Sequence, residues 1–132
     1  NPTQYIFHED TETFTIAYTE YNEDYNTFYK NASFDIEKAK KTREYGLDVA
    51  NHPNWFDASY IPWISYDCLH LELPDGHLHF NPIVNWGKCR EENERLVMPV
   101  SVRLNHAAAD GYLVALVFKT IEKEIGELCK QS

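Results

Sequence analysis

Residues 96–129 read LVMPVSVRLNHAAADGYLVALVFKTIEKEIGELC, and this stretch decides the fold. Its first nine residues, 96–104, are rich in branched apolar side chains, which is typical of a buried strand. Asn105, His106 and three alanines follow, and Asp110 then opens an amphipathic segment. A helix is predicted there because six apolar residues fall on one stripe: Leu113, Leu116, Val117, Ile121, Ile125 and Leu128.

The strand-to-helix junction carries a histidine and an aspartate four residues apart. Asp110 is well placed to cap the helix, since its carboxylate can accept hydrogen bonds from the free N–H groups of the first turn. His106 lies at the strand end, where a side chain is exposed but rigidly held. From spacing alone, the plain interpretation is favoured, in which His106 is satisfied by a backbone carbonyl and Asp110 is only a cap.

Composition predicts one folded globular domain over residues 1–132, with 43% hydrophobic and 14% aromatic residues. A formal net charge of −9 disfavours a general role on nucleic acid or anionic membranes, because both need a basic surface. No apolar run approaches the length of a membrane span, and Asn1-Pro2 does not open a secretory signal. We therefore expect neither nucleic acid nor membrane as a partner.

Three widely spaced cysteines, Cys68, Cys89 and Cys129, form neither a disulfide framework nor a zinc pattern. A reducing cytoplasm is the simplest location. The only methionine is Met98, so we expect the sequence to be processed or to be a piece of a longer protein.

The rest of the chain predicts strands on both sides of a helix. Residues 5–8 and 13–18 indicate two strands, and residues 23–46 indicate a helix that ends near Gly46. Residues 51–62 are predicted to form an aromatic-rich loop. Residues 63–73 alternate as a strand, the turn Pro74-Asp75-Gly76 follows, and residues 77–80 return as its hairpin partner.

After residues 82–88, a further apolar segment, a charged loop from Arg90 to Arg95 leads into the organising strand. These elements predict an α/β fold, a two-layer sandwich in which helices pack on one face of a mixed β-sheet.

The amino-acid sequences of several segments resemble those of the chloramphenicol acetyltransferase family. His106-Ala107-Ala108-Ala109-Asp110-Gly111 is similar to the His-x-x-x-Asp-Gly motif of coenzyme A-dependent acyltransferases. Residues 7–14, FHEDTETF, are similar to the Phe-His-x-x-Thr-Glu-Thr-Phe signature of the chloramphenicol branch. Residues 62–67, PWISYD, and 98–102, MPVSV, match further segments in the same order. The chain thus resembles the C-terminal part of the family fold. The family's N-terminal portion has no counterpart in it.

The resemblance implies an O-acetyltransferase that moves an acetyl group from acetyl-CoA to a hydroxyl of chloramphenicol or a similar small acceptor, an activity associated with antibiotic resistance. His106 would be the general base, which suits an imidazole whose pKa lies near working pH. Asp110 would support the junction structurally. Lys88 and Asn85 would lie at the coenzyme, with Lys88 near its phosphates. The resemblance also implies a cytoplasmic homotrimer whose sites lie at subunit interfaces, with acetyl-CoA as co-substrate and no bound cofactor.

The sequence departs from the family pattern at several positions. Cys68 stands where the family has a serine that donates to the developing oxyanion, and a thiol is a much weaker donor. Asn85 replaces a threonine, and Cys89 replaces an aromatic residue. Asn105 stands where the family has a second histidine. Arg90 and Arg95 are expected to belong to a solvated loop.

Two alternatives to this enzyme remain open. His77 and His79 on one predicted strand, with His70 on its neighbour, could ligate a divalent metal, although polar residues of an exposed hairpin are the favoured interpretation and no metal site is assigned. The stronger alternative is a truncated or degenerate non-catalytic relative that keeps the fold and the trimer surface.

Overall fold

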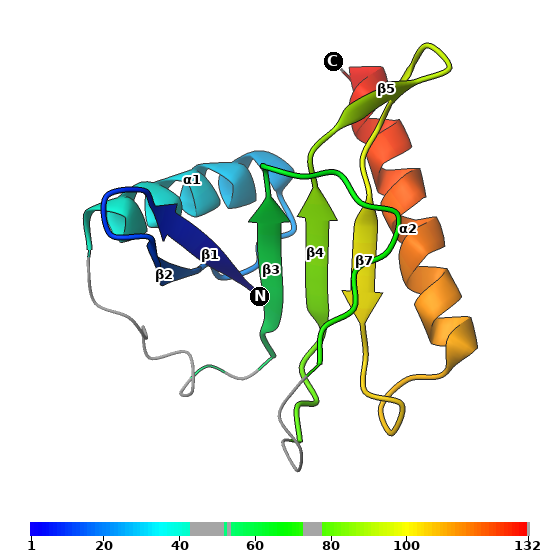
Figure 1. Ribbon diagram of the computed structural model, residues 1–132, viewed down its shortest axis with the longest axis horizontal. Coiled ribbons are helices and arrows are strands. Elements are labelled where there is room, and N and C mark those ends of the chain that lie inside the picture. The colour runs from blue at the N-terminus through cyan, green and yellow to red at the C-terminus, as the bar shows by residue number, and fades with distance from the viewer. Residues whose placement is uncertain (43–51, 53, 73–77, 132) are drawn as a thin grey trace.

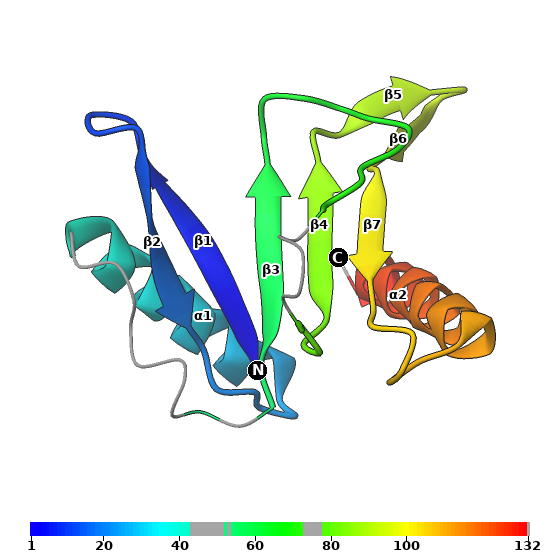
Figure 2. The same cartoon turned by 60° about the horizontal axis from the view of Figure 1, so that its bottom comes forward.

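The computed structural model describes residues 1–42, 52, 54–72 and 78–131, and a five-stranded sheet organises them (Figure 1). The strands and helices in chain order are β1 Pro2–His8, β2 Thr13–Tyr18, α1 Tyr25–Lys41, β3 Phe56–Ile61, β4 Ile83–Gly87, β5 Arg90–Glu92, β6 Arg95–Val97, β7 Val100–Arg103 and α2 Gly111–Gln131. Helix α1 packs on β1 and β2, and α2 lies beside β7 at the other end of the sheet (Figure 2).

The sheet has the strand order β2-β1-β3-β4-β7 and is mixed. β1 runs parallel to β3 and β3 parallel to β4, whereas the two edge strands, β2 and β7, run antiparallel to their neighbours. β5 and β6 form a separate antiparallel ribbon. The predicted α/β class with a mixed sheet is confirmed.

Helix α1 begins and ends with side chains that suit a helix. The Asp24 carboxylate accepts hydrogen bonds from the Thr27 hydroxyl and, at 2.8 Å, from the Thr27 N–H. These two bonds, of which the hydroxyl bond has the larger effect, hold the pKa of Asp24 below its ordinary value. Three lysines occupy the last turn, where positive charge favours the helix dipole. Ala32 and Ala39 are buried, which lets the helix approach the sheet closely. The predicted helix is confirmed over residues 25–41, and its expected end at Gly46 lies outside the described residues.

Two sequence predictions were wrong in the middle of the chain. Strand β3 occupies Phe56–Ile61, within the predicted loop 51–62. Residues 62–72 contain no strand, although their alternation favoured one. They instead cross the end of β4, where the Lys88 N–H donates to the Ile64 carbonyl at 2.7 Å and Tyr66 donates to the Asn85 carbonyl at 3.1 Å. From Trp63 to Glu72 the half-buried residues are Tyr66 and Leu69, so burial does not follow the alternation.

The predicted hairpin and the long organising strand also differ from the structure. Residues 78–80 form no strand, and the turn at residues 74–76 lies outside the described part of the chain. Residues 95–103 divide into β6 and β7 at Pro99, which has no N–H to continue a ladder. The loop predicted at Arg90–Arg95 is instead the β5–β6 ribbon.

Few large apolar side chains are buried in the part of the chain that the structure describes. The buried hydrophobic residues are Ala17, Ala32, Ala39, Ala58 and Ile83. Exposed large apolar residues include Phe34 at 69%, Leu78 at 76% and Trp63 at 57% of full exposure. Among the helices that the structure describes, none is long and apolar enough to cross a membrane.

Gly87 marks the closest packing between the sheet and the crossing loop. A Cβ atom at this position would lie 2.9 Å from the Ile64 carbonyl oxygen, from the Pro99 ring and from the Tyr66 ring. We therefore expect Gly87→Ala to destabilise the fold by about 1–3 kcal/mol through overpacking. Thermal unfolding followed by circular dichroism measures this change.

Gly126→Ala provides a matched control for this prediction. A Cβ at Gly126, in α2, would meet nothing within 4 Å. Alanine there should stabilise the helix by up to about 1 kcal/mol. Equal melting temperatures for the two variants would contradict the packing at Gly87.

Candidate active site

The turn between β7 and α2 is built by Asn105 and Asp110. The Asn105 side chain accepts from the Ala107 N–H at 2.9 Å, and the Asn105 carbonyl accepts from Ala108 and Ala109 at 2.9 and 3.0 Å. The Asp110 carboxylate accepts from the Leu113 N–H at 3.0 Å. These bonds satisfy backbone donors in a turn where no sheet or helix ladder can do so, and they confirm the predicted cap. The junction is therefore well determined locally.

His106 is exposed in this turn, and one of its ring nitrogens is held. Nδ1 lies 3.2 Å from the Ala109 carbonyl oxygen. Because a carbonyl can only accept, this contact selects the tautomer with the proton on Nδ1. Nε2 is then the unprotonated nitrogen, in the state that a general base requires. The backbone-carbonyl partner expected in the plain interpretation is present, and it is also what a catalytic histidine needs.

The Asn105 side chain also connects the turn to the segment before β4. Its Nδ2 donates to the His79 carbonyl at 3.3 Å. Asn85, buried in β4, lines two adjoining cavities of about 290 Å³ each on this side of the sheet. One of them is also lined by Ser101 and Arg103 of β7 and by Val114 of α2. The other is also lined by His79.

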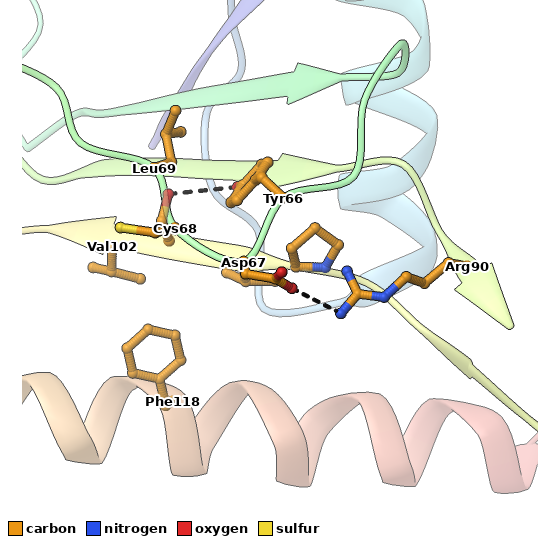
Figure 3. Close-up of a pocket in the computed structure, with 10 residues that line it drawn as sticks. Tyr66, Asp67, Cys68, Leu69, Arg90, Val102 and Phe118 are labelled. Carbon is orange, nitrogen blue, oxygen red and sulfur yellow. Dashed lines mark hydrogen bonds and ion pairs between the residues drawn. The ribbon is translucent and has the colours of Figure 1, made fainter. Parts of the chain in front are cut away.

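Cys68 lies in a different cavity, of about 450 Å³, between the crossing loop, β7 and α2 (Figure 3). Tyr66, Val102 and Phe118 also line this cavity. Cys68 is exposed and carries a free thiol.

The basic residues near the expected coenzyme site lie at the end of β4 and in β5. Lys88 is exposed directly after β4. The guanidinium of Arg90 donates to Ser65 at 2.7 Å and to the Asp67 carboxylate at 3.2 Å (Figure 3). Arg90 thus holds the crossing loop onto the ribbon, which a residue of a solvated loop would not do. Arg95 is exposed on the neighbouring strand β6.

The predicted site residues fall into three groups. His106 and Asp110 share the turn before α2, as expected. Asn85 lies inside the sheet, and its side chain reaches the two small cavities, whereas Lys88 lies three residues further along at the strand end. Cys68 occupies the separate cavity under the crossing loop, and His106 is not among the residues that line it.

The sequence reasoning missed a buried polar cluster centred on Asp57. Its Oδ1 accepts from the hydroxyls of Thr3 at 3.1 Å and Tyr5 at 2.9 Å, and its Oδ2 lies 3.3 Å from Nε2 of His79. An acidic residue inside a predicted aromatic loop gave no signal of this role. Its position after the Trp55-Phe56 pair, next to β1 in the sheet, becomes informative only once the strand pairing is known.

Among the described residues, the histidines are not arranged as the alternative of a metal site would require. His70 pairs with the Glu72 carboxylate at 3.7 Å on the surface, while His79 faces Asp57. Within the described ranges no group of three or more histidine, cysteine or acidic side chains could hold a metal ion. His77 lies outside them.

The fold matches that of a protein whose structure is solved. A solved chloramphenicol acetyltransferase superimposes with a TM-score of 0.78 at 23% identity, covering 92% of this chain and 59% of the solved one.

Sequence comparison gives the family. The chloramphenicol acetyltransferase family model matches residues 1–122, so the chain belongs to that family. Relatives named chloramphenicol acetyltransferase include that of Proteus mirabilis, 33% identical over 98% of this chain, and that of Campylobacter coli, 35% identical over 86%. Chloramphenicol acetyltransferase 3 of Escherichia coli is 32% identical over 94%. The chain spans 59%, 55% and 56% of these relatives' lengths, respectively.

Proposed function

We propose that this chain is an O-acetyltransferase that transfers the acetyl group of acetyl-CoA to a hydroxyl of chloramphenicol or a similar small acceptor. The single observation that carries the proposal is the geometry of His106. Its Nδ1 is held by the Ala109 carbonyl in a turn fixed by Asn105 and Asp110, which leaves Nε2 as an exposed base. The family membership supplies the reaction class.

In the proposed reaction, Nε2 of His106 takes the proton of the acceptor hydroxyl as its oxygen attacks the thioester carbonyl. The carbonyl oxygen becomes an oxyanion in a tetrahedral intermediate. The intermediate collapses, the carbon–sulfur bond breaks, and the departing coenzyme A thiolate receives the proton from the imidazolium. No acyl-enzyme is required, because the acceptor oxygen attacks the thioester directly, and the same imidazole serves both proton transfers.

The other residues have supporting roles in this proposal. Asp110 holds the turn by capping α2 and does not touch the substrates. Because His106 of the same chain does not line the Cys68 cavity, the Cys68 thiol would face an oxyanion formed at His106 of the partner subunit in the proposed trimer. Lys88 would attract the phosphates of the coenzyme, because an exposed ammonium at the end of β4 is the kind of charge that binds phosphate oxygens. Asn85 would offer an amide on the same strand.

Acetyl transfer by the purified chain tests the proposal. Product formed from acetyl-CoA and chloramphenicol, and its loss in His106→Ala, is the expected result.

Free cysteines at the surface are consistent with a cytoplasmic location, which belongs to the same proposal.

We also propose that the chain assembles as a homotrimer. The physical motive is the amount of apolar side chain left exposed within one chain, which commonly marks an interface. Light scattering at micromolar concentration should give three times the 15.5 kDa of one chain. A folded monomer with full activity would exclude a site shared between subunits.

A non-catalytic relative is the second candidate, and Cys68 favours it. In other enzymes, removing one hydrogen-bond donor to the oxyanion costs about 2.7–4 kcal/mol of transition-state stabilisation. A chain with a thiol at that position could keep the fold and the trimer surface and bind ligands without turnover. Binding of acetyl-CoA without product formation would support this candidate over the enzyme.

A further inference from the structure

A small cavity with a buried carboxylate lies beside the turn that carries His106. It has a volume of about 290 Å³. Five of its lining residues are polar and two are apolar: Tyr5, Asp57, Ser59, His79 and Asn85, with Leu71 and Ile83. The Asn105 side chain donates to the His79 carbonyl, so one wall of the cavity is bonded directly to the residue before His106.

Asp57 and His79 form the polar centre of this cavity. Both side chains are largely removed from water, at 11% and 17% exposure, and Nε2 of His79 lies 3.3 Å from Oδ2 of Asp57. The other carboxylate oxygen, Oδ1, already accepts hydrogen bonds from Thr3 and Tyr5. The side of the carboxylate that faces His79 is therefore where a ligand donor could join the pair.

Stability alone gives no reason for this arrangement. A carboxylate out of water is costly unless it is paired, and well-packed apolar residues in place of a buried pair are often neutral or stabilising. Small-ligand sites, in contrast, are concave and use a few convergent polar groups to select their ligand. A cavity beside a candidate base fits the second explanation.

We infer that this cavity anchors the acceptor, and that the acceptor presents an ammonium group to Asp57. An ionised carboxylate only accepts hydrogen bonds, so the matching ligand group must donate. Ser59 supplies a further partner for a polar substituent. The inference rests on the proposed function and adds to it a preference for amine-bearing acceptors.

Two probes that differ at one group test the inference. Chloramphenicol carries a dichloroacetamide, and its deacylated form carries a primary amine at the same carbon. Calorimetric titration of the full chain should show the amine binding at least about tenfold more tightly than chloramphenicol, because both probes carry the same two hydroxyls and only the protonated amine adds a cation that pairs with the carboxylate. Asp57→Asn keeps the size of the side chain but removes its charge, and should abolish that preference.

Glu37→Gln is the matched control, because Glu37 is an exposed carboxylate on α1 that pairs with Lys40 at 2.6 Å. It should keep the preference of the parent. If Asp57→Asn fails to fold by circular dichroism, His79→Gln takes its place in the same titration. Tighter binding of chloramphenicol than of the amine, or an equal ratio in the parent and the Asp57→Asn variant, would overturn the inference.

Acetyl transfer is measured separately with both compounds, so the two ideas can fail independently. Transfer to chloramphenicol together with an unchanged binding ratio in the variant would leave the acetyltransferase standing and remove the polar-anchor inference. Amine binding that depends on Asp57, without any transfer, would support the anchor and remove the enzyme.

Discussion

Replacing His106 with alanine is expected to lower the rate of acetyl transfer by about 10²–10⁴-fold, the usual contribution of a general base. The fold should survive, because the His106 ring is exposed and its one hydrogen bond in the structure goes to the nearby Ala109 carbonyl. The measurement is kcat with acetyl-CoA and chloramphenicol, with the melting temperature recorded on the same preparation.

His52→Ala is the matched control for that loss. His52 is also exposed, but its ring stacks on Tyr18 at a centroid distance of 4.1 Å, away from the β7–α2 turn. It should retain parental turnover. If His106→Ala retains activity within about tenfold of the parent, another group takes the proton and the proposed mechanism is wrong.

Replacing Cys68 with serine is expected to raise kcat by more than about tenfold with little change in the Michaelis constant for the acceptor. A hydroxyl donates a stronger hydrogen bond than a thiol, and the oxyanion exists only in the transition state and intermediate. A gain in kcat at constant Michaelis constant is the kinetic signature of such an interaction. Steady-state kinetics with chloramphenicol as acceptor measure both quantities.

Because Cys68 is exposed, the effect of this substitution on kcat is easy to interpret. Serine in a cavity of about 450 Å³ can remain hydrated, so the cost of burying an unpartnered hydroxyl does not arise. Cys129→Ser, at an exposed cysteine near the end of α2, controls for general effects of removing a thiol. Equal kcat for Cys68→Ser and the parent would show that Cys68 does not face the oxyanion.

The parts of the fold that sequence could predict are those with a clear period or cap. Helix α2 and its cap Asp110 followed from one apolar stripe and one carboxylate, and the β7–α2 turn was placed correctly for that reason. Strand β3 was missed because two prolines and the Trp55-Phe56 pair favoured a loop over residues 51–62, although apolar and polar residues alternate from Phe56 to Tyr60. Residues 63–73 were predicted as a strand from their alternation, but from Trp63 to Glu72 the chain is a loop in which burial does not alternate.

The candidate site was predictable only where local chemistry fixes it. The position of His106 at a strand end could be read from neighbouring residues, and so could its expected carbonyl partner. The Asp57–His79 pair joins residues 22 positions apart that meet because β3 and β4 are paired, and a single sequence carries no signal for that contact. The separation of Cys68 from the His106 turn depends on the path of the crossing loop, which was predicted incorrectly.

The most direct test of the central claim is one acetyl-transfer assay with the purified chain, acetyl-CoA and chloramphenicol. Acetylated product should be detected by mass spectrometry, because Cys68, Cys89 and Cys129 are exposed and would react with reagents that detect free coenzyme A thiol. The account predicts O-acetyl-chloramphenicol that accumulates with time and requires His106. Absence of acetylated product under conditions where the chain is folded and binds acetyl-CoA would contradict it.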